Sequence, residues 1–430
     1  MRIVCVVFLF VSVRLAAQAP DATFNAGAVE SLENMLASDA MRGRATFTPD
    51  IERAADSIEL QFRAAGLQTW NGSSSYRQPF AMIRAKLLSI SGSLGGVPLT
   101  ADNTVIISSA EHIQIADSSQ YKIGQIKAGD DLRSVAQKVM AAKGNHVFFV
   151  DTSFAKAFPR LSRLAGQQFG SPYTNVFVLG EGNFGSHYSF GLTADQQITK
   201  SDLANVVGIL PGKGKLAGEY VIFSGHYDHL GVRKPDARGD SIYNGANDDA
   251  SGTTAVILLA RYYSQLHKNQ RTLVFAAFTA EEIGEFGSQY FSSQFDPDKV
   301  VAMFNIEMIG SPSKWGENSA FITGYERSDM GKIMESNLTG SGFTFYPDPY
   351  PTQNLFYRSD NASLARKGVP AHTISTTQID IDKTYHTPED EVSTLDLKNM
   401  AAIIHAIALS SRTIVEGKDT PSRVDSSQVH

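Results

Sequence analysis

The chain of 430 residues has a single cysteine, Cys5, which lies in an apolar segment at the amino terminus. The remaining roughly 410 residues cannot form a disulfide and depend on a hydrophobic core, for which they are long enough. Lysine and arginine form no runs and the formal net charge is −6, so the composition argues against a nucleic-acid-binding surface. Beyond residue 13, no apolar run has the length of a membrane helix, and we expect no membrane insertion.

The amino terminus is typical of an export signal. Met1-Arg2 gives a positive start, Ile3 to Val13 is almost wholly apolar, and small residues follow near Gln18 and Ala19. We therefore interpret residues 1–19 as a signal peptide and expect a periplasmic or secreted protein. Loss of the two arginines in this segment changes the net charge from −6 to about −8.

The rest of the chain divides by its hydrophobic pattern. Residues 20–85 and 201–415 are expected to form one α/β domain, in which a helix at 52–65 is followed, after 201, by regularly alternating strands and helices. Residues 86–200 contain short β-like runs between turns, at 104–107, 113–115, 146–150 and 175–179, and are interpreted as an inserted, β-rich, lid-like domain. The tail at 416–430 is polar and is expected to be disordered.

The alternation of strands and helices after residue 201 predicts a mainly parallel sheet with helices on both faces. Its expected strands are 205–210, 219–225, 271–279, 299–307, 319–323 and 370–376, and its expected helices are 249–267, 285–294, 328–339, 360–367 and 395–415.

Polar residues with metal-binding groups follow several of these strands. The run from Val221 ends in His226-Tyr227-Asp228, and the run at 273–278 leads into Glu281-Glu282. A third run reaches Glu307. Open α/β sheets place their ligands beyond the carboxyl ends of the strands. We therefore expect these side chains to meet at one edge of the sheet.

The ligand count favours two metals. The candidate ligands are His226, Asp248, Glu282, Glu307 and His386. Zinc favours imidazole and carboxylate ligands, and a catalytic site keeps one position open, so five ligands are too many for one such ion. If one carboxylate bridges two ions, each ion receives three protein ligands, and the metals lie roughly 3.5–4 Å apart.

Two neighbouring carboxylates have other expected roles. Adjacent residues on a strand point to opposite sides, so Glu281 can reach a water molecule that bridges the two metals while Glu282 binds one metal. This makes Glu281 the candidate general base. Asp228, two residues after His226, is expected to accept the imidazole N–H.

Each motif also has a plain structural interpretation. His-x-Asp is common by chance, an Asp pair before Ala250 caps helices, and Glu pairs are usually solvated. Tyr385-His386-Thr387-Pro388 could be an ordinary turn. These explanations would have to hold independently at successive strand ends, which favours the metal site.

The ordered motifs resemble the co-catalytic dizinc aminopeptidase family, which includes bacterial leucine aminopeptidases, aminopeptidase Y, glutamate carboxypeptidases and glutaminyl cyclases. The resemblance covers residues from about 30 to 415, including the lead-in Met41-Arg42-Gly43-Arg44. It implies a zinc-exopeptidase-like three-layer αβα sandwich with a mixed central sheet, two Zn²⁺ per chain and peptide substrates. It also implies that Asp248 bridges the metals and that Glu281 deprotonates a water shared by them. The possible substrate-binding residues are His229, Tyr357, Arg358, Asp360 and Tyr385.

The expected activity is removal of amino-terminal residues from peptides. Most peptidases of this family have Asp where this chain has Glu307, and Glu at this position often accompanies carboxypeptidase or deacylase activity in related hydrolases. A zinc carboxypeptidase is therefore one alternative. A glutaminyl cyclase-like transferase and a non-catalytic binding protein on the same scaffold are the others.

Overall fold

The computed structural model describes residues 20–162, 168–183 and 189–429, so the predicted signal peptide at 1–19 lies outside the described residues. The chain divides into two units. The larger unit contains residues up to Gln78 and from Ala204 onward, and the inserted unit is Pro79–Leu203. The sequence had placed the insertion at 86–200. The difference arises at two long strands, β2 (Arg77–Leu94) and β10 (Phe190–Leu210), which both run across a unit boundary.

A mixed sheet forms the middle of the larger unit, in the strand order β17-β16-β18-β15-β11-β14-β10. The inner strands β14, β11, β15 and β18 are parallel to one another, whereas β10 and β16 are antiparallel to their neighbours β14 and β18. The strands of this unit after β10 are β11 (Tyr220–His226), β12 (Gly231–Val232), β13 (Ile242–Tyr243), β14 (Thr272–Phe278), β15 (Val300–Ile306), β16 (Ser319–Ile322), β17 (Thr344–Pro347) and β18 (Ala371–Ser375), and the short β1 (Gln68–Thr69) pairs with β10.

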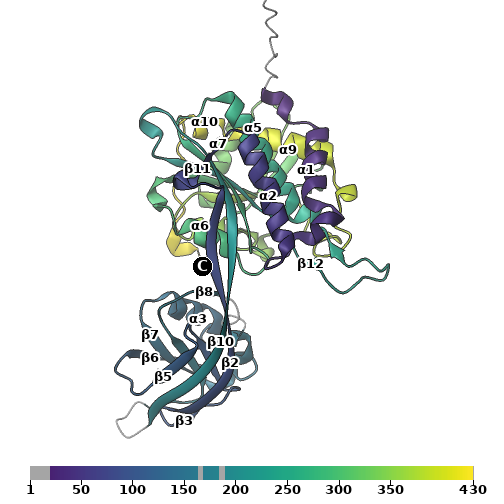
Figure 1. The fold of residues 1–430 in the computed structure, drawn as a ribbon. Coiled ribbons are helices and arrows are strands. Elements are labelled where there is room, and N and C mark those ends of the chain that lie inside the picture. The colour runs from purple at the N-terminus through teal and green to yellow at the C-terminus, as the bar shows by residue number, and fades with distance from the viewer. Residues whose placement is uncertain (1–19, 163–167, 184–188, 430) are drawn as a thin grey trace, which may run out of the picture. The chain divides into compact units, whose positions relative to one another are not determined.

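Helices cover both faces of this sheet, which confirms the predicted αβα sandwich (Figure 1). One face packs against α1 (Ala26–Ala37), α2 (Pro49–Ala64), α5 (Ser251–Leu266), α7 (Met330–Asn337) and α9 (Leu397–Ser410). The other face packs against α6 (Phe286–Ser292) and α8 (Ala362–Ala365). The short α10 (Arg412–Val415) follows α9.

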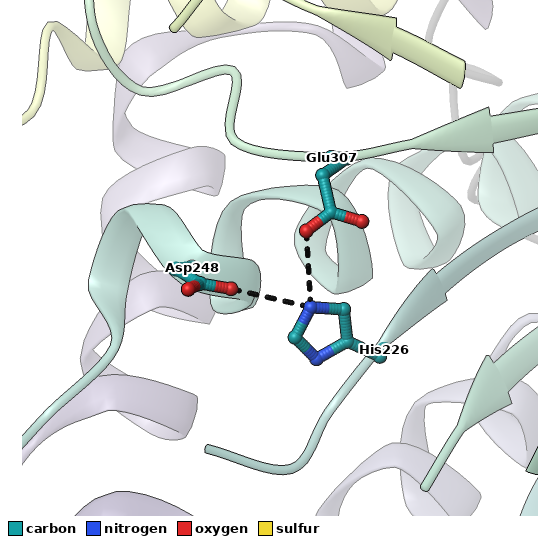
Figure 2. Close-up of side chains that lie close together, drawn as sticks. All are labelled: His226, Asp248 and Glu307. Atoms are coloured by element: carbon teal, nitrogen blue, oxygen red, sulfur yellow. Dashed lines mark hydrogen bonds and ion pairs between the residues drawn. The ribbon is translucent and has the colours of Figure 1, made fainter. Parts of the chain in front are cut away.

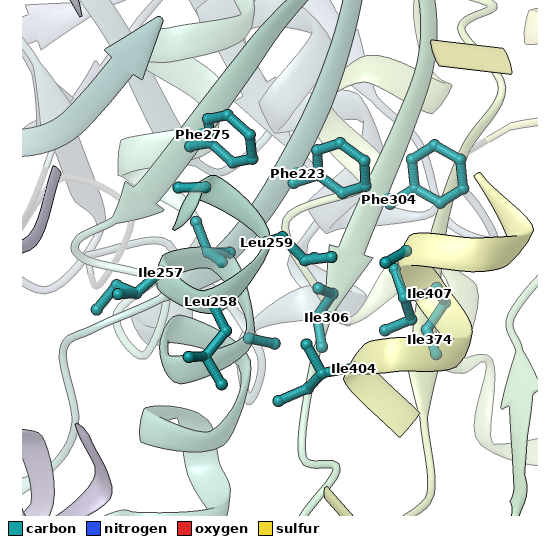
Figure 3. Packing of buried hydrophobic residues seen from close by; sticks show 14 of the residues in the cluster. Phe223, Ile257, Leu258, Leu259, Phe275, Phe304, Ile306, Ile374, Ile404 and Ile407 are labelled. Carbon is teal, nitrogen blue, oxygen red and sulfur yellow. The ribbon is translucent and has the colours of Figure 1, made fainter. Parts of the chain in front are cut away.

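Strand periodicity decides which side chains enter each core. Phe223 on β11 lies directly across from Phe275 on β14 and Phe304 on β15, and the rings stack with centroids 5.6 and 5.1 Å apart (Figure 3). The alternate residues Ile222 and Val274 point to the opposite core, because successive side chains in a strand lie on opposite faces. Both faces are apolar, and the sheet is therefore a rigid frame for the loops at its carboxyl edge.

The inserted unit has its own sheet, in the order β4-β9-β7-β6. Its elements besides β2 are β3 (Val97–Pro98), β4 (Thr104–Ile107), β5 (His112–Ile115), β6 (Tyr121–Ile126), α3 (Leu132–Ala141), β7 (Asn145–Val150), β8 (Gln168–Phe169) and β9 (Asn175–Leu179). Helix α3 buries Leu132, Ala136 and Val139 against this sheet. The β-like runs predicted at 104–107, 113–115, 146–150 and 175–179 all fall on these strands.

The predicted disorder of the tail is wrong. Val424 and Val429 are 4% and 9% exposed and belong to the core that includes Phe291. The buried Arg271 donates hydrogen bonds to the carbonyl of Asp419 and the hydroxyl of Thr420, both at 2.6 Å. The tail is polar in composition, but its two valines cover the sheet and its oxygen atoms satisfy a buried guanidinium.

No helix in the described part of the chain combines the length and the apolar character needed to span a membrane.

Candidate metal centre

The candidate ligands follow neighbouring parallel strands, as the sequence predicts. Strand β11 ends at His226, β14 leads to Glu281 and Glu282, β15 leads to Glu307, and β18 leads to the loop that contains His386. Because these four strands are parallel and adjacent, their carboxyl ends lie at one edge of the sheet. Asp248 lies in the turn just before α5.

The first group of ligands, called the His226 half-site, consists of His226, Asp248 and Glu307 (Figure 2). The Nε2 atom of His226 lies 3.2 Å from Oδ1 of Asp248 and 3.2 Å from Oε1 of Glu307. The histidine side chain is fully buried. Its Nδ1 lies 3.1 Å from the main-chain oxygen of Asp228, and this contact directs Nε2 toward the carboxylates.

The second group, the His386 half-site, consists of His386, Asp248 and Glu282. The Nε2 atom of His386 lies 3.1 Å from Oδ2 of Asp248 and 3.2 Å from Oε2 of Glu282. Asp248 therefore contacts one histidine with each carboxylate oxygen. The side chain of His386 is 35% exposed, so this half-site opens to solvent.

The side chains of both half-sites could hold a metal ion. Two ligands bound to one zinc at 2.0–2.2 Å in a tetrahedral arrangement are about 3.3 Å apart, close to the four distances above. The carboxylates also favour positive charge on the histidines. Burial lowers the pKa of His386, but hydrogen bonds to Asp248 and Glu282 outweigh burial and raise it to about 9. The donor set suits zinc, which binds nitrogen and carboxylate oxygen.

Glu281 faces the same cluster without belonging to either half-site. Its Oε2 lies 3.9 Å from Nε2 of His226. Burial and the neighbouring Glu307 raise the pKa of Glu281 well above its ordinary value, and the charge of His226 opposes this shift. A carboxyl group that is buried and next to the reacting position can both accept and return a proton.

The expected role of Asp228 is partly wrong. Its main-chain oxygen contacts the ring of His226, whereas its carboxylate Oδ1 is 3.8 Å from the same Nδ1. The carboxylate instead accepts hydrogen bonds from the backbone amides of Glu281 (3.1 Å) and Glu282 (3.4 Å). Since β11 ends at His226, Asp228 lies beyond the strand, and its backbone is closer to the ring than its side chain is.

Sequence reasoning missed the residues that hold the Asp248 turn. Asp390 accepts hydrogen bonds from the backbone amides of Asn247 (2.7 Å) and Asp248 (3.0 Å). The buried Arg44 donates to the carbonyls of Asn244 (2.7 Å) and Gly245 (2.9 Å). Arg44 belongs to the lead-in motif, which was the only signal for it. Asp390 had no sequence signal, because only the fold brings its loop to this turn.

Two further contacts fix the carboxylates around the His226 half-site. Ser359 donates a hydrogen bond of 2.5 Å to Oε2 of Glu307. Asp249 accepts hydrogen bonds from the backbone amides of His226, Gly252 and Met308, so it ties β11 and β15 to the start of α5. The sequence suggested a helix-capping role for Asp249, and its bond to Gly252 is of this kind.

The predicted substrate-binding residues separate into two sets. Arg358 and Tyr385 line a pocket beside Glu307, and Tyr385 stacks on His386 with ring centroids 3.9 Å apart. Among the other pocket residues are Met308, Phe321, Leu355, Thr373 and Ile379. The structure does not place the other three predicted residues in this pocket.

Each of these three residues has another environment. The hydroxyl of Tyr357 donates a hydrogen bond to the carbonyl of Gln428, and substrate contact stays a prediction for this residue. Asp360 is fully buried, and burial raises its pKa. His229 is buried next to Glu282, behind the His386 half-site.

Comparison with known proteins agrees with this geometry. Residues 205–410, which contain every candidate ligand, match the model of peptidase family M28. This region belongs to peptidase family M28. Aminopeptidase YwaD of Bacillus subtilis is 22% identical to the chain over 277 residues, which are 63% of the chain and 57% of YwaD. A probable zinc metalloprotease of Pyrenophora tritici-repentis is 34% identical over 163 residues, 36% of each protein. The matched segments thus span less than two thirds of these curated relatives.

Solved structures show the same fold as this chain. The aminopeptidase of Aneurinibacillus sp. strain AM-1 gives a TM-score of 0.54 at 17% identity, over 92% of the chain and 95% of that protein. BSAP, a zinc aminopeptidase from Bacillus subtilis, gives a TM-score of 0.53 at 17% identity, over 91% of the chain and 95% of that protein.

Proposed function

We propose that the chain is a zinc aminopeptidase that binds one metal in each half-site. The observation that carries this proposal is the position of Asp248, whose two carboxylate oxygens lie 3.2 and 3.1 Å from Nε2 of His226 and of His386. A carboxylate in this position can bridge two ions. The M28 match and the aminopeptidase and zinc metalloprotease among the relatives support the same activity.

The protein groups around the metals have separate tasks in hydrolysis. Zinc bound in these half-sites would lower the pKa of a water molecule and polarise the carbonyl of the scissile bond. Glu281 would take a proton from the attacking water and return it to the leaving amine. Asp228 accepts hydrogen bonds from the amides of Glu281 and Glu282, and this fixes the position of the base, Glu281, relative to the candidate ligand Glu282.

Charge around the site favours a substrate with a free amino group. The carboxylates gathered here are those of Asp228, Asp248, Asp249, Glu281, Glu282, Glu307 and Asp360. Burial raises the pKa of each of Asp249, Glu281 and Asp360 well above its ordinary value, and the other carboxylates can accept hydrogen bonds from the ammonium group of a peptide amino terminus. The pocket beside Glu307 would then receive the first side chain of the peptide.

One observation favours a second candidate, a carboxypeptidase. Arg358 lines the same pocket, its side chain is exposed, and no ion pair of its guanidinium is found among the described residues. A guanidinium is suited to binding the carboxylate at the end of a peptide. Glu307 in place of the usual Asp is consistent with this alternative.

A pool of peptides, half of them acetylated at the amino terminus, separates the two candidates. The purified protein is incubated with the pool in zinc or in a chelator, and the products are followed by mass spectrometry. The aminopeptidase proposal predicts zinc-dependent shortening of free amino termini only. Shortening from the carboxyl end, in acetylated peptides as well, would contradict it and support the role of Arg358. Absence of any shortening would contradict both candidates.

We also propose that the protein is exported, from the apolar pattern of residues 3–13. Amino-terminal sequencing of protein purified from the native source is expected to begin near residue 19 or 20. A protein that retains Met1 and the apolar segment would contradict export by cleavage.

A further inference from the structure

His229 is a fully buried histidine beside the His386 half-site. Its side chain has no exposed surface, so its ring nitrogens depend on partners within the protein. Leaving a buried polar atom without a partner is unfavourable by about 1–3 kcal/mol. The ring of His229 is therefore expected to bond to a group that packs against it.

The neighbours of the ring identify this interaction. Nδ1 of His229 lies 2.7 Å from Oε1 of Glu282. The other oxygen of Glu282 faces His386 at 3.2 Å. The backbone at Gly245 supports the ring, since a Cβ atom there would lie 2.4 Å from Cγ of His229. The ring is thus held beside Glu282 and has little freedom to turn away.

Distances separate a metal ligand from a residue that positions a ligand. Ligands of one tetrahedral zinc are about 3.3 Å apart. His229 is too near Glu282 Oε1, at 2.7 Å, and too far from Asp248 Oδ2, at 3.9 Å, to fit this pattern. The distance of 2.7 Å instead fits a charge-assisted hydrogen bond.

We propose that His229 positions Glu282 by donating the Nδ1 proton to Oε1, which leaves Oε2 for the metal of the His386 half-site. This inference rests on the proposed dinuclear centre. The His226 half-site has the same arrangement, because Glu307 directs Oε1 to His226 while Oε2 accepts a hydrogen bond from Ser359. Each metal-binding glutamate thus has one oxygen for the metal and one for a fixed donor. Such supporting contacts typically contribute 10–100-fold to metal affinity.

Three variants test this role by zinc affinity rather than by turnover. His229→Ala removes the donor, and His229→Asn keeps an N–H near the position of Nδ1. His372→Asn is the matched control, because His372 is equally buried but contacts Ser328 and Thr323, away from the metal centre. Zinc binding to the purified chain is measured by competition with a chelating dye, and folding of the metal-free variants by circular dichroism.

The inference predicts that His229→Ala weakens one of the two zinc sites 10–100-fold and leaves the other within about twofold. His229→Asn should recover most of the loss, and His372→Asn should retain both affinities. Unchanged zinc binding in His229→Ala, or equal weakening of both sites, would overturn the role of His229.

X-ray absorption of the zinc-loaded wild type should show an average of about one histidine nitrogen per zinc. A clearly higher value would make His229 a ligand and overturn the positioning role. A wild type that binds fewer than two zinc ions would instead contradict the proposed function itself.

Discussion

The two half-sites share Asp248 but differ in how their histidines are held. His226 is the last residue of β11, is fully buried, and has both ring nitrogens in contact with neighbours. His386 lies in a loop after β18, adopts a positive φ of 58°, and is 35% exposed. The sheet thus fixes one half of the centre and loops fix the other. If each half-site binds a metal, as proposed, this difference predicts that the His386 half-site loses or exchanges its metal more easily.

The largest effect is expected at a residue that belongs to neither half-site. Glu281→Gln keeps the shape of the side chain but removes the base, and turnover should fall roughly 10³-fold. Zinc content should remain two per chain, measured by atomic emission on the same sample that is assayed. A variant that loses zinc together with activity would show that Glu281 holds metal, which would contradict its separation from both half-sites.

Removal of each histidine tests the comparison directly. His226→Ala and His386→Ala should each weaken zinc binding in one half-site by more than about 100-fold. Only His226→Ala should also lower the unfolding free energy of the metal-free protein, by about 2 kcal/mol, because it leaves a cavity and unpaired groups in the buried frame. Urea unfolding in a chelator measures this difference. Equal destabilisation by the two variants would remove the distinction between a sheet-held and a loop-held half.

Asp390 should affect both halves together. Because it accepts the amides of Asn247 and Asp248, Asp390→Asn should displace the shared ligand and weaken both zinc sites by about 10–100-fold. The control is Asp396→Asn, at the amino-terminal cap of α9, where Asn caps as well as Asp. Calorimetric titration with zinc compares the two variants. Weakening confined to one half-site would contradict a common support through Asp248.

The smallest effect on the metal centre is expected at Glu33, a buried residue of α1 near Arg44. Burial raises the pKa of Glu33 from 4.5 to about 8, so the folded protein holds a proton that the unfolded chain releases. The unfolding free energy should therefore fall as pH rises from about 4.5 to about 8. Glu33→Gln removes this fall.

We expect Glu33→Gln to raise the unfolding free energy at pH 8 by about 2 kcal/mol relative to the wild type. Urea unfolding of the metal-free protein at pH 5 and pH 8 measures the change. Glu30→Gln, on the exposed side of α1, is the control and should have no such effect. A Glu33→Gln variant with the same pH slope as the wild type would contradict the raised pKa.

The same contrast explains what the sequence could predict. His226, Glu282 and Glu307 were found because they follow apolar runs that could only be buried strands, and parallel strands end at one edge. His386 has no such strand directly before it and was found from its motif and from the family resemblance. Arg44, Asp390 and Ser359 act on the site through backbone groups or through another ligand. Their partners lie 52 to 200 residues away along the chain, so no local pattern identifies these contacts.

The order of the tail was missed for a related reason. Composition describes residues 416–430 as polar, but two valines at the right spacing and a buried arginine elsewhere decide where the segment packs. Only the folded sheet provides the surface that these valines cover.

Anomalous diffraction from crystals of the zinc-loaded protein, collected just above the zinc absorption edge, tests the dinuclear centre most directly. We expect two peaks on either side of the Asp248 carboxylate, roughly 3.5–4 Å apart. One should contact His226 and Glu307, and the other, with the lower occupancy after brief exposure to a chelator, should contact His386 and Glu282. A single peak, or a second peak away from His386, would contradict the account.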